Sequence, residues 1–108
     1  MRPSDLIQGT LDVLILKAVA SEPRHGWAIA KRIRAASGDV LLIKQGSLYP
    51  ALHRLEQQGF IRSEWQTGES GRETKVYSIT RAGRQQLNEE LGQWERLSAA
   101  IRLTLRNA

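Results

Sequence analysis

Apolar residues recur with a helical period over the first third of the chain. Residues 4–21 carry a wide apolar arc, which predicts a first helix covered on more than one side. After a break at residues 22–24, His25-Gly26-Trp27 opens a second helical pattern that runs to about Ala36. Its expected buried residues are Trp27, Ile29, Ala30 and Ile33. A turn at residues 37–39 follows, and the four apolar residues 40–43 are interpreted as a short strand.

The narrowest apolar stripe lies in residues 45–58, where Leu48, Leu52 and Leu55 are spaced four and three apart. This spacing predicts a third helix held to the core along one face. Ser47 is the expected N-cap, since its hydroxyl can accept from a first-turn amide. Gly59 follows the last apolar residue, where a left-handed C-terminal cap favours glycine.

After Gly59 the period changes to two. Residues 60–66 and 74–79 alternate as strands, with Ile61 and Trp65 on one face of the first and Tyr77 and Ile79 on one face of the second. The polar, glycine-containing residues 67–73 between them are expected to form a hairpin loop.

Thr80 is the expected cap of a last helix that runs to about residue 106. Its apolar positions alternate in spacing between four and three and form a heptad seam: Leu87, Leu91, Trp94, Ile101 and Leu105. Such a helix would be about 39 Å long, more than so small a domain can cover alone. We therefore expect a two-fold partner to bury the seam, with Leu6 of the first helix also in the interface.

These elements predict an α+β, mainly helical chain: a winged helix-turn-helix with a long C-terminal dimerisation helix. We expect residues 1–80 to form the DNA-binding region and residues 81–108 the dimerisation helix, within one structural domain overall. No internal repeat, low-complexity tract or interdomain linker is visible in the sequence.

Composition narrows the classes of partner that the protein can bind. The chain has 108 residues, with 16 Lys+Arg against 11 Asp+Glu, so its net charge of +5 favours a polyanion such as double-stranded DNA. It has no cysteine, which excludes disulfides and thiolate metal sites. The longest apolar run is too short to cross a membrane, and the first residues lack the features of a signal peptide, so we expect a cytoplasmic protein without a membrane partner.

The polar face of the third helix carries the candidate DNA contacts Ser47, Tyr49, Pro50, His53 and Arg54. Recognition helices place such N-terminal side chains against base edges, and arginine binds guanine or a phosphate. The alternative for Arg54 is an ion pair with Glu56, Glu64 or another nearby acid.

Arg72 and Lys75 are candidate phosphate contacts from the hairpin, with a solvated loop as the alternative. His25 precedes the second helix, whose amide terminus would suit a phosphate. The only histidines are His25 and His53, and no metal or phosphate-loop motif accompanies them. We therefore expect neither an enzyme nor a cofactor.

A longer motif strengthens the DNA-binding interpretation. Residues 46–56, Gly-Ser-Leu-Tyr-Pro-Ala-Leu-His-Arg-Leu-Glu, with Gly59-Phe60-Ile61, resemble the signature of the PadR family of transcriptional regulators. Residues 9–16, His25-Gly26-Trp27 and residues 71–83 are similar to further parts of that family, in the same order. The resemblance implies a homodimeric winged-helix protein that binds DNA, usually as a repressor of a nearby gene.

The resemblance also raises two points about this chain. Family wing tips are usually strongly basic, whereas Glu69 and Glu73 flank Arg72 here. Some short members bind aromatic drugs or phenolic acids between subunits through a tryptophan of the last helix, and Trp94 is similarly placed. Two alternatives therefore stand beside the repressor: a sensor gated by an aromatic small molecule near Trp94, and a winged-helix module that binds another protein.

Overall fold

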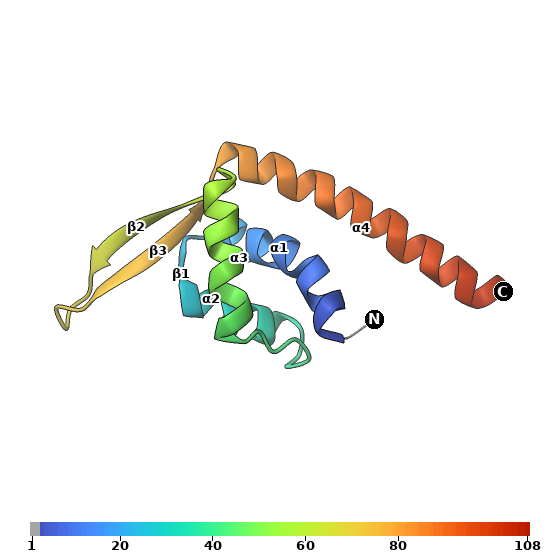
Figure 1. Cartoon of the computed structure of the whole chain (residues 1–108), viewed down its shortest axis with the longest axis horizontal. Helices are drawn as coiled ribbons and strands as arrows, with labels where there is room; N and C mark the ends of the chain where they lie inside the picture. Colours follow the sequence, from blue (N-terminus) through green and yellow to red (C-terminus); the bar gives the residue numbers. More distant parts are fainter. Residues whose placement is uncertain (1–2) are drawn as a thin grey trace.

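The four predicted helices and the two predicted strands of the hairpin follow one another in the expected order, in a computed structural model that describes residues 3–108, with side chains from Thr10 onward (Figure 1). They are α1 (Pro3–Ser21), β1 (Arg24–His25), α2 (Gly26–Ala36), α3 (Gln45–Gln57), β2 (Ile61–Thr67), β3 (Glu73–Ile79) and α4 (Arg81–Asn107). The α+β, mainly helical winged helix-turn-helix predicted from the sequence is confirmed.

The core lies where α1, α2 and α3 meet. Ile15, Leu16, Ile29, Leu48 and Leu52 are each fully buried, with an exposed fraction of 0%. Each helix supplies part of this cluster, and β2 closes it with Ile61. Burying each of these side chains stabilises the fold by about 1.5–3 kcal/mol. The core therefore fixes how α3 is held, which matters for the surface that α3 exposes.

The sheet contains one strand that the sequence analysis did not predict. The strand order is β1-β3-β2, all antiparallel, and Arg24 and His25 pair with Tyr77 and Val76. The sequence pattern predicts a break and a helix start at these residues. Two residues carry no strand period of their own; they become a strand because β3 offers them a free edge for backbone hydrogen bonds.

The prediction of a strand at residues 40–43 is wrong. This segment is an irregular loop in which Ile43 is buried, while Val40 and Leu42 are 75% and 57% exposed. Its backbone is held by Ser37, whose Oγ accepts from the Leu41 amide at 2.9 Å. The apolar run consists of one buried residue, one partly buried residue (Leu41) and two exposed residues, which the pattern alone did not separate from a buried strand.

Two further local predictions need correction. Ser47 is not the N-cap of α3, because the helix begins at Gln45 and Lys44 occupies the cap position without a side-chain hydrogen bond. Trp27 is not buried but 39% exposed, since α2 buries the neighbouring face with Gly26, Ile29, Ala30 and Ile33.

The helix caps on either side of the β2–β3 hairpin, at Gly59 and Thr80, are as predicted. Gly59 has φ +79°, and the amide of Phe60 donates to the carbonyl of Leu55 at 3.0 Å, which ends α3 in a left-handed cap. The Thr80 hydroxyl accepts from the Gly83 amide at 3.0 Å and caps α4. These two ends determine where the β2–β3 hairpin, called the wing below, leaves the core.

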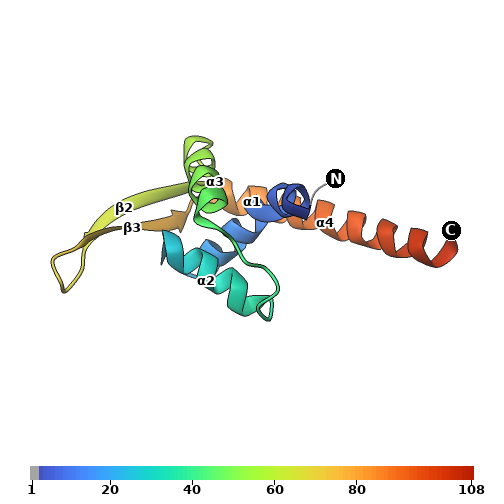
Figure 2. The same ribbon diagram turned by 60° about the horizontal axis from the view of Figure 1, so that its bottom comes forward.

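The wing and the end of α4 project in different directions from the core (Figures 1 and 2). Helix α4 passes α1 and then continues well beyond it, and the chain measures 58 × 28 × 21 Å along its principal axes. Within residues 3–108, no helix combines the length and apolarity needed to cross a bilayer.

Candidate nucleic-acid interface

Helix α3 is anchored on one face and exposed on the other. Its anchoring side chains are at most 2% exposed: Leu48, Ala51, Leu52 and Leu55. The opposite face carries the residues predicted to contact DNA, of which Ser47 is half-buried and the others are exposed: Tyr49, Pro50, His53 and Arg54. The sequence stripe therefore identified correctly which face of α3 is free to meet a ligand.

Arg54 is engaged by an acid from another helix. Its Nη2 donates to Oδ1 of Asp12 on α1 at 2.5 Å, with side chains that are 49% and 28% exposed. The acid-pairing alternative is therefore what the structure contains, with Asp12 as the partner instead of Glu56 or Glu64. Asp12 lies 42 residues away in the chain, so no local spacing indicated it. The pair joins α3 to α1.

Tyr49 lies over the start of α2. A Cβ added to Gly26 would lie 3.0 Å from Cε1 of Tyr49 and 3.5 Å from Cε2 of Tyr77. An alanine at position 26 would therefore press on the Tyr49 ring, whereas its contact with the Tyr77 ring would be an ordinary one. Burial raises the pKa of Tyr77, and the neighbouring Glu56 and Tyr49 raise it further, so Tyr77 is neutral near pH 7. The half-exposed Tyr49 thus rests on a packed, uncharged support.

Glu56 connects α3 to both strands of the wing. The Ser63 hydroxyl on β2 donates to its Oε2 at 2.5 Å, and Nζ of Lys75 on β3 lies 4.0 Å from its Oε1. The same ammonium group lies 5.7 Å from the ring centre of Trp65 and 6.0 Å from that of Tyr77. Lys75 is thus held against the face of the wing that adjoins α3.

Trp65 is a surface residue of the wing that the sequence analysis did not include among the site residues. It pairs directly with Lys75 across the two strands and is 64% exposed. The available signal was a large aromatic residue on one alternating strand with a lysine on the next strand of the hairpin. The pattern, however, placed Trp65 on the same face as Ile61, which is buried. The face is the same; burial ends toward the tip because no helix covers it.

His25 and Arg72, both predicted to contact DNA, lie around one hollow. It has a volume of about 300 Å³ and is otherwise lined by polar wing residues: Gln66, Thr67, Gly68, Ser70 and Thr74. Pairing of β1 with β3 brings His25 there, because its register partner Val76 is two residues from Thr74. The structure thus groups an imidazole and a guanidinium that are 47 positions apart in the sequence.

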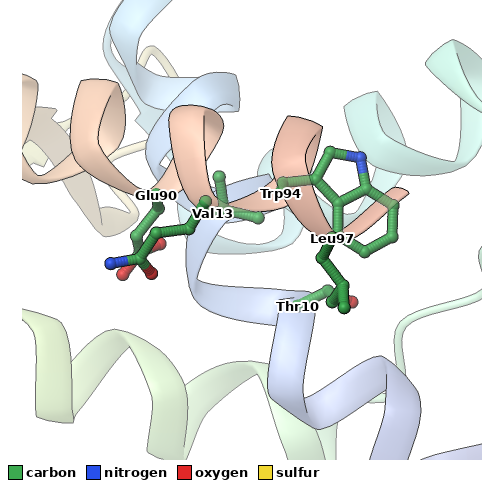
Figure 3. A pocket seen from close by; sticks show the side chains of 6 residues that line it. Thr10, Val13, Glu90, Trp94 and Leu97 are labelled. Atoms are coloured by element: carbon green, nitrogen blue, oxygen red, sulfur yellow. The ribbon is translucent and has the colours of Figure 1, made fainter. Parts of the chain in front are cut away.

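A second hollow, of about 230 Å³, lies between α1 and α4 (Figure 3). Figure 3 shows side chains from both helices around it, with Trp94 and Leu97 from α4 and Thr10 and Val13 from α1. Glu90 and Gln93 complete its lining. The sequence analysis singled out Trp94, and the structure adds the α1 residues that face it.

The predicted seam of α4 divides into a buried and an exposed part. Leu87 is buried in the chain's own core and Leu91 packs against that core. Beyond them, Trp94, Ile101 and Leu105 are 48%, 47% and 79% exposed. The side chain of Leu6 lies outside the described residues. An apolar row therefore continues along α4 after the core ends.

Comparison with known proteins places the chain among transcriptional regulators. Residues 15–89 match the model of the transcriptional regulator PadR-like family. A transcriptional regulator from Mycobacterium tuberculosis is 42% identical over 87 residues, which cover 81% of this chain and 78% of that protein. An uncharacterised protein from Lysinibacillus sphaericus is 31% identical over 100 residues, covering 93% and 92% of the two chains.

Solved structures agree over nearly the whole chain. A transcriptional regulator from Clostridium thermocellum superimposes with a TM-score of 0.84 at 30% identity, covering 94% of this chain and 96% of that one. A PadR family transcriptional regulator from Eggerthella lenta gives a TM-score of 0.83 at 35% identity, with coverage of 97% and 89%. The similarity includes α4, which the family match does not span fully.

Proposed function

Because the chain belongs to the PadR-like family of transcriptional regulators, we propose that it is a homodimeric repressor that binds an inverted DNA repeat. Helix α3 would enter the major groove and the wing would follow the adjacent backbone. A dimer bound over a promoter excludes other proteins from it, which is the physical basis of repression.

One observation carries the DNA-binding part of the proposal. The face of α3 that is not buried in the core adjoins the face of the wing that carries Trp65 and Lys75. Together these two faces present polar and aromatic side chains on one surface. In this proposal the exposed Tyr49 and His53 reach base edges, whereas Arg72, Lys75 and His25 meet phosphates. The net charge of +5 supports a polyanionic partner.

Binding-site selection from a randomised duplex library tests this proposal. We expect an inverted repeat whose half-sites are about 34–36 Å apart, so that both copies of α3 meet the same side of the duplex. Enrichment of a single half-site, or of no motif, would contradict it.

Variants separate the two kinds of contact. Tyr49→Ala should cost about 1–3 kcal/mol on the selected duplex and much less on a scrambled one. Arg72→Ala should weaken binding to both duplexes alike and lower the salt dependence by about one unit. Equal losses on both duplexes for Tyr49→Ala would remove it from base recognition.

The exposed row on α4 supports the dimer. Ile101 and Leu105 are 47% and 79% exposed, and a two-fold copy of α4 would bury both seams together. Ile101→Asp should leave the fold intact and give a monomer in sedimentation, because an unpaired buried charge costs several kcal/mol. Leu103→Asp is the matched control, since Leu103 is similarly exposed, at 55%, but lies off the seam. A dimeric Ile101→Asp variant would place the interface elsewhere.

The hollow beside Trp94 favours a second function, gating by an aromatic small molecule. An indole that is half exposed over a lined hollow can stack a flat ring. Such a ligand would regulate only if it favoured one separation of the two α3 helices. Tryptophan fluorescence should respond to planar aromatic compounds in the native chain and in Trp27→Phe, but not in Trp94→Phe. An unchanged response in Trp94→Phe would exclude this hollow as the site.

A further inference from the structure

Three exposed apolar residues have no role in the proposed DNA or dimer surfaces. Trp27, Val40 and Leu42 are 39%, 75% and 57% exposed, and they belong to α2 and to the loop that follows it. The other large exposed apolar residues lie on α3, on the wing or on α4. Exposed apolar groups that gather in one place mark interaction sites more often than scattered ones do.

Two of these residues line one groove between α2 and residues 42–44. It has a volume of about 320 Å³, and its apolar lining consists of Trp27, Ala30, Leu42 and Ile43. Its remaining lining is cationic: Lys31, Arg34 and Lys44. No acid is among the lining residues. We refer to it below as the α2 groove.

The loop that forms one side of the α2 groove is fixed by hydrogen bonds. The Asp39 amide donates to the carbonyl of Arg34 at 2.9 Å, and the Leu41 amide donates to Oγ of Ser37 at the same distance. Nε of Arg34 also lies 3.2 Å from Oδ1 of Asp39. The groove is therefore formed before any partner arrives, which lowers the entropic cost of binding.

The charges around the groove define what fits it. Arg34 is partly neutralised by Asp39, whereas Lys31 and Lys44 have no acidic partner among the described side chains. The end of α4 from a second copy is a poor occupant, because residues 101–107 carry Arg102 and Arg106 and no acid. DNA is also a poor match, since a phosphate backbone leaves the apolar floor without apolar contacts.

We propose that the α2 groove binds an acidic amphipathic segment of a partner protein. Apolar side chains of that segment would cover Trp27 and Leu42, and its carboxylates would meet Lys31 and Lys44 at the rim. Apolar contacts would supply affinity, and the charges would set the orientation and the rate of association. The α2 groove shares no lining residue with the proposed DNA contacts or with the hollow at Trp94, so the proposal can hold or fail independently of the proposed function.

Fluorescence anisotropy with a labelled synthetic peptide that alternates leucine and phenylalanine with glutamate tests the proposal on the full chain. A peptide with glutamine in place of every glutamate is the control probe. We expect saturable binding of the acidic peptide, weakening as salt rises, and at least about fivefold weaker binding of the glutamine peptide.

Surface variants locate the binding. Leu42→Gln and Lys31→Gln should each weaken the acidic peptide by about fivefold or more, and the matched exposed pair Leu103→Gln and Lys17→Gln should not. All four residues are exposed, so the variants should keep the native melting temperature. Equal binding of both peptides, or equal effects of both pairs of variants, would overturn the proposal. If Leu42→Gln and Lys31→Gln instead weaken duplex DNA, the groove faces DNA, and the proposal is wrong.

Discussion

Glu56 offers the sharpest test of how the wing and α3 act together. Its carboxylate lies 4.0 Å from the ammonium group of Lys75 and accepts a hydrogen bond from Ser63. Glu56→Gln keeps an oxygen that can accept from Ser63 but removes the charge. Lys75 is then free of its acidic partner, so we expect the variant to bind DNA more tightly, on the selected and the scrambled duplex alike.

The size of the gain follows from exposure. The side chains of Lys75 and Glu56 are 38% and 32% exposed, so solvent screens the pair. Pairs of this kind contribute about 0.2–1 kcal/mol, which corresponds to a gain in DNA affinity of up to about fivefold. If Lys75 then gains a full phosphate contact, the salt slope should steepen by about 0.9. Anisotropy titrations on both duplexes at several salt concentrations measure both quantities.

Glu64→Gln is the matched control, because Glu64, on β2, carries the same charge as Glu56 but forms no ion pair with Lys75 among the described residues. An equal gain in Glu64→Gln would mean that net charge alone raises the affinity. Lys75→Met combined with Glu56→Gln should abolish the gain. Weaker DNA binding by Glu56→Gln at an unchanged melting temperature would refute the reasoning, because the carboxylate would then assist binding instead of restraining Lys75.

Three further predictions concern the scaffold. Gly83→Ala should destabilise the fold by about 3 kcal/mol, since the added methyl would overlap the carbonyl oxygen of Phe60. Gly92→Ala on the same helix, near only a flexible arginine tip, should instead stabilise it by about 0.5–1 kcal/mol; equal melting temperatures would contradict this. Asp12→Asn removes the charge that pairs with the half-exposed Arg54, so denaturant unfolding should show a loss of stability below about 1 kcal/mol. The raised pKa of Tyr77 means that the folded state holds its proton longer, so stability is full below about pH 10 and falls above it. Tyr77→Phe should flatten that alkaline decline in thermal melts, and an unchanged decline would assign it to other groups.

Much of the architecture follows from local pattern because local chemistry decides it. The leucines of α3 are spaced for one buried face, and all three are buried in the structure. Gly59 ends α3 and Thr80 begins α4, since a left-handed cap and a hydroxyl acceptor satisfy backbone groups within a few residues. The exposed face of α3, and hence most candidate DNA contacts, could be predicted for the same reason.

Tertiary structure decided the features that depend on distant neighbours. Residues 24–25 become a strand because they pair with β3, whereas residues 40–43 pair with no strand and remain a loop. Trp27 and Leu42 are exposed because the neighbouring Ile29, Ile33 and Ile43 occupy the core in their place. The partners of Arg54 and Lys75 come from α1 and α3, so the charge that either residue offers to DNA depends on packing across the chain. Sequence periodicity determines which face is apolar, whereas only the packed molecule determines what each face meets.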